Sequence, residues 1–281
     1  MELNEQLRVE IVDMSYDGLG VAKVDGYILF VDECLEITEL GKNYGFAKNI
    51  GISRKSPYRV KPVCPHFGVC GSCELMHMEY HQQLQFKRKT VEETIKKVAK
   101  LEKVNIDKIV GMDNPYNYRN KVQMPFAYNK KAIFGYYKKK SHEVVPIDKC
   151  YLQPDEITEV IKFIKNLCNE YHIRGYNEKL NKGDIRHVLI RESIKTGEIM
   201  VILICTKSEY PELDELVGKL IKRHPRIASV MINVNKYQTN TILGNYFKVL
   251  YGRNYIIDEL CGLKFKIGCR SFYQVNAYQT E

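Results

Sequence analysis

The sequence predicts a multidomain α+β protein in which a small antiparallel β-barrel precedes a larger, mostly antiparallel α+β domain. Three observations support this. The chain has 281 residues, enough for two domains. Residues 6–31 alternate polar and apolar side chains, with turn dipeptides between the runs, and a second β-like run follows. The middle of the chain mixes helical periodicity with short strand-like runs.

The barrel is expected over residues 1–55. Residues 6–31 alternate with period two and are interrupted by Asp17-Gly18 and Asp25-Gly26, dipeptides that favour hairpins. A second β-like run covers residues 35–52. Residues 53–62, SRKSPYRVKP, carry two prolines and four basic residues, so we interpret them as a linker.

The central domain is expected over residues 56–74 and 110–260, with a helical insertion over residues 75–109. Within the insertion, apolar residues at helical spacing predict a helix over residues 75–101. Strands are expected over residues 121–128 and 131–138, with a turn at Asn129-Lys130. The remaining pattern predicts helices over 156–169 and 212–222, strands over 187–191, 199–205 and 227–234, and further short strands beyond residue 238.

The net charge of +9 and the 20 tyrosines fit a polyanionic partner, although a merely soluble basic protein has the same composition. Nine cysteines, an odd number, argue for reduced thiols rather than a disulfide framework. No apolar run is long enough to cross a bilayer, and the start MELNEQLRVE does not look like a signal peptide. We therefore expect a cytoplasmic protein without a membrane partner.

Three cysteines, Cys64, Cys70 and Cys73, have the spacing C-x5-C-x2-C, and Cys150 is the best fourth ligand. Structural zinc sites usually pair their ligands in two short knuckles, whereas three clustered thiolates and one distant thiolate are typical of a [4Fe–4S] cluster. The nearby glycines Gly68 and Gly71 suit a tightly curled loop. A zinc site that includes histidine stays open as an alternative, and its candidate ligands are His66, His77 and His81.

The other five cysteines lie in apolar periodic contexts, and we expect them to be small buried side chains: Cys34, Cys168, Cys205, Cys261 and Cys269. Residues 116–140 interleave basic and aromatic side chains. On adjacent strands such a face stacks bases and meets phosphates, although a solvated strand face gives the same pattern. We predict RNA contacts at Arg119 and Lys121.

Several segments, in chain order, resemble one known family. SYDGLGVAKVDGYILFV resembles the start of a TRAM domain, a small OB-like RNA-binding barrel. CPHFGVCGSC, YRNKVQMPF, RHVLIR and SFYQVNAYQTE resemble the RNA (uracil-5-)-methyltransferases, and most closely the bacterial 23S rRNA branch with a TRAM domain and a [4Fe–4S] cluster.

The resemblance implies S-adenosyl-L-methionine-dependent methylation of uracil C5 in 23S rRNA by a monomer. By the same resemblance, Gln274 contacts S-adenosyl-L-methionine, and the [4Fe–4S] cluster is ligated by Cys64, Cys70, Cys73 and Cys150. The family pattern also implies that the helical insertion packs against the methyltransferase domain.

The sequence departs from the family pattern in two places. The segment VDECLEITEL is several residues shorter than in the family, which predicts a malformed hairpin. The family's Rossmann-like half would follow Glu281, so we expect the methyltransferase domain to be largely absent, with residues 261–281 as its truncated start.

The chemistry gives a further expectation. C5 of uracil is a weak nucleophile, so a thiolate must first add at C6 and a base must later remove the C5 proton. Cys261 and Cys269 do not lie in the family's catalytic position, so we predict that the chain has no catalytic residue and is inactive alone. The alternatives are a non-catalytic RNA-binding iron–sulfur module and a tRNA uracil-5 methyltransferase. A radical enzyme is disfavoured because its C-x3-C-x2-C loop is absent.

Overall fold

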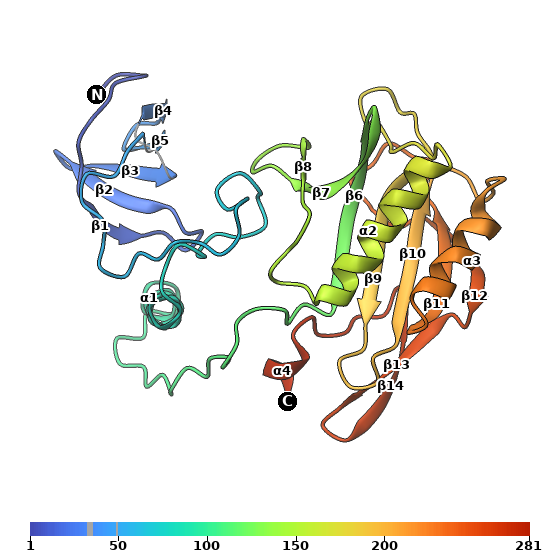
Figure 1. The fold of residues 1–281 in the computed structure, drawn as a ribbon. Helices are drawn as coiled ribbons and strands as arrows, with labels where there is room; N and C mark the ends of the chain where they lie inside the picture. The colour runs from blue at the N-terminus through green and yellow to red at the C-terminus, as the bar shows by residue number, and fades with distance from the viewer. Residues whose placement is uncertain (33–35, 49) are drawn as a thin grey trace. The chain divides into compact units, whose positions relative to one another are not determined.

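The computed structural model describes residues 1–32, 36–48 and 50–281. The chain forms two compact units (Figure 1). We call the first the N-terminal unit, which consists of Met1–Gly68 and Cys73–Val110, and the second the sheet unit, which consists of Val69–Ser72 and Gly111–Glu281. The predicted domain boundaries stay predictions, and each unit is described by itself.

The N-terminal unit contains a five-stranded sheet with the order β1-β2-β3-β5-β4. Its strands are β1 (Ile11–Met14), β2 (Gly20–Val24), β3 (Tyr27–Asp32), β4 (Glu36–Leu40) and β5 (Tyr44–Lys48). The hairpin predicted at Asp25-Gly26 is confirmed, because these two residues join β2 to β3. Both have positive φ, 49° and 81°, as a tight two-residue hairpin turn requires.

The small sheet differs from the prediction in one pairing, because β3 and β5 run parallel to each other. The sheet is therefore mixed rather than wholly antiparallel. One face carries a small apolar core, which is formed by Ala22, Leu29, Val31 and Ala47. The segment expected to form a malformed hairpin, residues 31–40, runs through residues 33–35, which lie outside the described residues, so this prediction and that for Cys34 are not tested.

The predicted helix is confirmed as α1 (Tyr80–Ala99). It begins later than expected because the residues before it form a turn, in which the Met78 N–H donates to the Leu75 carbonyl at 2.9 Å. None of its residues is buried, and Val98 is 78% exposed. A salt bridge of 2.7 Å between Lys89 and Asp13 links this helix to the strand β1.

The sheet unit is built on a seven-stranded sheet with the order β12-β11-β10-β9-β6-β7-β8 (Figure 1). Only β10 and β11 pair in parallel, because α3 crosses over between them. The strands are β6 (Lys121–Asn129), β7 (Lys131–Tyr137), β8 (Val144–Pro146), β9 (Ile185–Glu192), β10 (Ile199–Cys205), β11 (Ile227–Val234) and β12 (Tyr246–Gly252). The other elements are α2 (Asp155–Glu170), α3 (Leu213–Arg223), α4 (Ala277–Thr280) and the hairpin of β13 (Tyr255–Leu260) and β14 (Leu263–Gly268).

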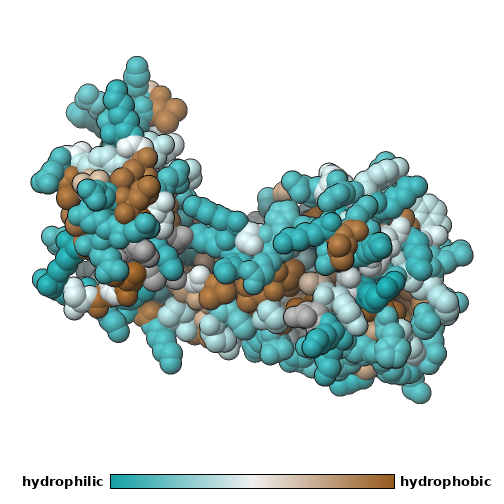
Figure 2. Space-filling view, turned by 90° about the horizontal axis from the view of Figure 1, so that it is seen from above, coloured by the Kyte–Doolittle hydropathy of each residue, from teal (hydrophilic) through white to brown (hydrophobic). Residues whose placement is uncertain are grey.

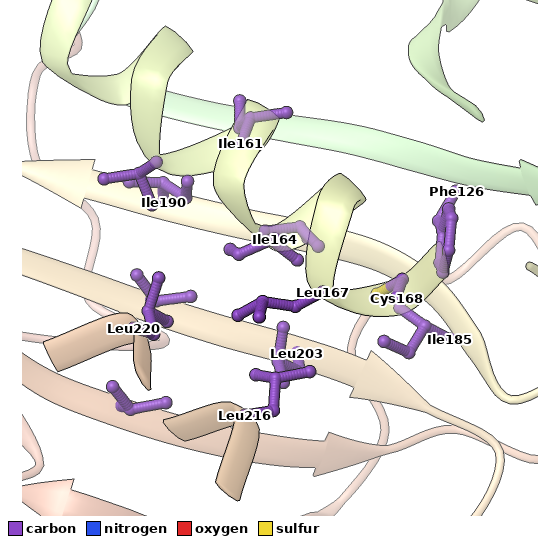
Figure 3. Packing of buried hydrophobic residues seen from close by; sticks show 14 of the residues in the cluster. Phe126, Ile161, Ile164, Leu167, Cys168, Ile185, Ile190, Leu203, Leu216 and Leu220 are labelled. Atoms are coloured by element: carbon purple, nitrogen blue, oxygen red, sulfur yellow. The ribbon is translucent and has the colours of Figure 1, made fainter. Parts of the chain in front are cut away.

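The main core lies between the sheet and the helices α2 and α3. In Figure 3, Ile164 of α2 and Leu216 of α3 point toward the strands, where Leu203 lies in β10. All residues of β9 and β10 are buried. Continuous apolar runs are typical of strands that are covered on both faces, which explains the run VILIC in β10.

The opposite face of the sheet is covered by the β13–β14 hairpin. Ile256 and Ile267 of the hairpin pack against Met200, Ile202 and Met231. Asp258, which is fully buried, accepts a hydrogen bond of 2.6 Å from the Ser193 hydroxyl and one of 3.1 Å from the Lys195 N–H. This carboxylate therefore fixes the hairpin to the turn between β9 and β10.

The predicted fold class is wrong where it gives a wholly antiparallel barrel, because the small sheet is mixed, as described above. The larger unit is mostly antiparallel, as predicted, and is one seven-stranded sheet with helices on one face and a hairpin on the other. The expected absence of a methyltransferase domain is overturned by the structural comparison given below.

Across the described part of the chain, no helix has the length and apolar character that spanning a bilayer requires. Figure 2 shows mostly hydrophilic residues on the visible face of each unit, with small separate hydrophobic patches.

Candidate functional site

Two of the quoted sequence segments, YRNK and SFYQVN, lie side by side in the sheet unit. The Asn120 N–H donates to the Val275 carbonyl at 3.0 Å, and the Asn120 side-chain amide donates to the Gln274 carbonyl at 2.9 Å. Arg119 forms an antiparallel bridge with Asn276. Asn120 and Gln274 are 154 positions apart, so the fold rather than the local sequence joins them.

A buried arginine provides a second anchor for the same segment. Arg191, at the end of β9, is only 4% exposed, and its guanidinium donates to the Ser271 carbonyl. Its burial lowers the pKa of the guanidinium. The Arg191 Nε is buried without a hydrogen-bond partner among the described residues.

Residues 271–274 therefore form an arch whose two ends are fixed. Within this arch, Phe272 is 86% exposed and the Gln274 side chain is exposed, with no hydrogen bond among the described residues. Tyr273 turns inward and packs with the apolar residues under the β13–β14 hairpin, and burial raises the pKa of its hydroxyl to about 12. The predicted cofactor contact Gln274 thus projects from a backbone held in place.

Three basic side chains surround the start of β6. Lys121 lies directly opposite Arg191 across the two strands, and Arg119 comes two residues earlier. Burial, and then the positive charges of Arg191 and Arg119, lower the pKa of Lys121. No ion pair recorded for the described residues involves any of the three. The predicted RNA contacts Arg119 and Lys121 therefore lie together in a place where positive charges repel one another, and an anion would relieve the repulsion.

The cysteine loop is fixed locally at its centre. The Gly71 N–H donates to the Tyr137 carbonyl at 2.9 Å, and a Cβ at Gly71 would lie 3.0 Å from the Lys139 Cα. Gly68 has a φ of 86°, which glycine adopts without strain. Both glycines are therefore required by the backbone of this loop. The four predicted ligands are half-buried thiols: Cys64, Cys70, Cys73 and Cys150.

The described residues do not assemble a metal site. Within residues 1–32, 36–48 and 50–281, no group of three or more His, Cys, Asp or Glu side chains is arranged to hold a metal ion. His77, one of the alternative zinc ligands, packs its ring against Phe67 with the centroids 5.4 Å apart, and burial lowers its pKa. Four thiols are the donor set that a [4Fe–4S] cluster uses, but the described geometry shows no cluster site, so the cluster stays a proposal.

The other cysteines have different environments. Cys168 and Cys205 are buried, as predicted, and burial raises the pKa of both thiols, to about 12 for Cys168. The prediction for Cys261 is wrong, because this residue is exposed in the turn between β13 and β14. Its φ of 50° belongs to that turn. The apolar strands on either side suggested a buried position, but the turn interrupts them. Cys269 is half-buried just after β14 rather than fully buried.

Comparison with known proteins shows what the chain resembles. No protein-family model matches it. It is 40% identical to an uncharacterized RNA methyltransferase of Halalkalibacterium halodurans over 99% of this chain and 62% of the relative. It is 38% identical to an uncharacterized RNA methyltransferase of Listeria monocytogenes over 100% of this chain and 63% of the relative. The chain thus spans less than two thirds of the length of these relatives.

A solved structure has the same fold. The tRNA (uracil-54, C5)-methyltransferase of Pyrococcus abyssi, in complex with S-adenosyl-L-homocysteine, matches with a TM-score of 0.71 and 23% identity. The match covers 97% of this chain and 62% of that chain. The prediction that the methyltransferase domain is largely absent is therefore wrong, because 97% of this chain matches the fold of that methyltransferase over 62% of its length. The comparisons also give no support to the prediction that the chain is inactive and lacks catalytic residues.

Sequence reasoning missed Asn120 and Arg191. A charged residue at the end of the apolar strand RHVLIR was a usable signal, because buried arginines usually have a specific partner. Asn120 lies between the two predicted RNA contacts, and its role depends on a segment 154 residues away, which no local pattern shows.

Proposed function

We propose that this chain belongs to the RNA (uracil-5-)-methyltransferases and acts in the S-adenosyl-L-methionine-dependent methylation of uracil C5 in RNA. One observation carries the proposal. Asn120 joins the strand with the predicted RNA contacts to the segment with the predicted cofactor contact. The relatives named RNA methyltransferases and the fold of a tRNA uracil-C5 methyltransferase support it.

The RNA contacts of the proposal are Arg119 and Lys121. Their positive charges lie beside that of Arg191. Among the described residues, none of the three forms an ion pair with a carboxylate. Backbone phosphates supply the compensating negative charge, which makes binding sensitive to salt. These residues position the RNA, and they carry no base specificity.

The cofactor contact of the proposal is Gln274. S-adenosyl-L-methionine supplies an electrophilic methyl group on its sulfonium. The Gln274 amide is exposed, makes no hydrogen bond among the described residues, and projects from a fixed backbone, so it fits the role of one polar contact to such a ligand.

The most specific form of the proposal is that the substrate is 23S rRNA, as the sequence resemblance implies. A tRNA substrate is the second candidate, because the solved structure with the same fold is a tRNA methyltransferase. The chain should be incubated with labelled S-adenosyl-L-methionine and either 23S rRNA or tRNA, and the modified nucleoside identified by mass spectrometry. Label at uracil C5 in one RNA supports the proposal and decides between the substrates. Equal affinity for RNA and for DNA of the same sequence, without methyl transfer, would contradict it.

We also propose that Cys64, Cys70, Cys73 and Cys150 ligate a [4Fe–4S] cluster. The C-x5-C-x2-C spacing, the half-buried thiols and the glycine-dependent loop support it. The anaerobically purified chain should contain about four iron and about four sulfide. The Cys150→Ser variant should lose both, whereas Cys261→Ser, at an exposed turn, should keep them. Stoichiometric zinc without iron would contradict the proposal and favour the histidine alternative.

The remaining features of the proposal follow the sequence resemblance. Residues 1–55 are a TRAM-like RNA-binding unit, α1 packs on the methyltransferase domain, and the protein is a cytoplasmic monomer. Light scattering and sedimentation test the oligomeric state. A stable dimer at micromolar concentration would contradict the monomer.

A further inference from the structure

We infer that Asn120 is a positioning residue for Gln274 and therefore for cofactor binding. The inference rests on the proposed function, because it takes Gln274 as a cofactor contact. It adds a residue that neither the sequence motifs nor the comparisons assign.

Asn120 makes three hydrogen bonds that tie three segments together. Its backbone N–H binds the Val275 carbonyl, its side-chain amide binds the Gln274 carbonyl, and its own carbonyl accepts from the Glu192 N–H at 2.9 Å. Asn120 is 4% exposed, so water does not replace these bonds easily. The carbonyl of Gln274, at the end of the arch, and that of Val275, directly after it, are thus fixed to the end of β9 through one residue.

The second anchor of the arch makes the arrangement specific. Arg191 holds the carbonyl of Ser271, and Asn120 holds those of Gln274 and Val275. The backbone is therefore fixed at both ends, and the orientation of the exposed Gln274 amide depends on its own side-chain torsions alone.

The exposed side chains of the arch indicate why it is held. Phe272 is 86% exposed and Gln274 is exposed, so their side chains contribute little apolar burial to stability. Fixing the backbone of each such residue costs conformational entropy. An arch that serves only to cover the core needs no buried polar anchors at both ends of an exposed pair. Functional side chains, by contrast, need such support to keep their geometry.

The test replaces the donor without adding charge. Asn120→Leu keeps a similar side-chain volume but leaves the Gln274 carbonyl without its amide donor. We expect the variant to bind S-adenosyl-L-homocysteine about tenfold more weakly by calorimetry, the effect of one buried hydrogen bond. Its affinity for RNA should stay within about twofold, because Arg119 and Lys121 are unchanged. Asn240→Leu is the matched control, because Asn240 is exposed and should change neither affinity.

A double-mutant cycle separates positioning from a general structural role. If Asn120 acts through Gln274, the double variant Asn120→Leu/Gln274→Ala should bind no more weakly than Gln274→Ala alone. Hydrogen exchange should also speed up in residues 271–277 of Asn120→Leu, while β9, β10 and β11 keep their protection. Additive losses in the cycle, or unchanged exchange in the arch, would overturn the inference.

The failures of the inference and of the proposed function are distinguishable. If the unchanged chain binds no S-adenosyl-L-homocysteine, the proposed cofactor contact fails and the inference fails with it. If the unchanged chain binds and Asn120→Leu binds equally well, only the inference fails. If Asn120→Leu does not fold at the assay temperature, Asn120→Ala, a smaller neutral variant whose side chain has no hydrogen-bond donor, gives the same comparison.

Discussion

Replacing Lys121 with methionine should stabilise the protein and weaken the proposed binding to RNA. Lys121 lies opposite Arg191, and burial together with two neighbouring arginines lowers its pKa. Like charges directly opposite each other on paired strands destabilise a sheet by roughly 0.2–1 kcal/mol. Methionine keeps the apolar stem of lysine and removes the charge, so we expect Lys121→Met to raise the free energy of unfolding by about 0.5 kcal/mol at pH 7.

The pH dependence of this gain follows from the sign of the pKa shift. The folded-state pKa of Lys121 lies below its ordinary value of 10.5, so the unfolded chain holds the proton more tightly. The cost of the buried charge is present in full at neutral pH and disappears as the pH rises toward 10.5. The advantage of Lys121→Met should therefore shrink between neutral and strongly alkaline pH.

The same change should weaken RNA binding. For a single strand, each neutralised phosphate contributes about 0.7 to the slope of log affinity against log salt. Lys121→Met should therefore flatten the slope by about 0.7, and fluorescence anisotropy over a potassium chloride series measures it. Urea denaturation measures the stability, and Lys264→Met, at an exposed position of β14, is the control. A variant that is less stable and binds RNA with an unchanged salt slope would refute the reasoning, because Lys121 would then be structural.

Three further changes test the fold. Burial lowers the pKa of His187 from 6.5 to about 4, so the unfolded chain gains a proton before the folded one and acid destabilises the fold. This residue alone should cost about 2 kcal/mol between pH 7 and pH 5, a loss that His187→Gln should lack in urea titrations. Leu203→Ala, in the fully buried β10, should cost about 2–5 kcal/mol without a change in denaturant slope, and an effect under about 1 kcal/mol would contradict the described core. Gly183→Ala should lower the melting temperature strongly, since a Cβ would lie 2.4 Å from the Gly175 carbonyl oxygen at a φ of 138°, whereas Gly218→Ala, with open space on α3, should not.

Local elements were predictable from local patterns. The turns at Asp25-Gly26 and Asn129-Lys130 were expected from residue type, and both are found, with a φ of 61° at Lys130. The helix expected over residues 156–169 is α2, because its apolar side chains recur at helical spacing and face the sheet. These features depend on residues close together in the chain.

Long-range features were not predictable in this way. Alternation predicts that a segment is a strand, but not which segment it pairs with or packs on. It therefore did not show that β3 pairs in parallel with β5, or that β13–β14 packs on the sheet. Of the site residues, Arg119, Lys121 and Gln274 came from composition or resemblance, and the fold brings their segments together. No local sequence pattern marks Asn120 and Arg191 as anchors, because this role depends on their distant partners.

The contact between Asn120 and Gln274 also has a consequence for synthesis on the ribosome. Domains fold from the N-terminus as the chain emerges, at roughly 5–20 residues per second. The start of β6 must therefore wait while 154 further residues are translated before its partner appears. The arch is added late to a sheet that is already largely assembled, so the proposed cofactor contact takes its position only after the sheet that supports it has formed.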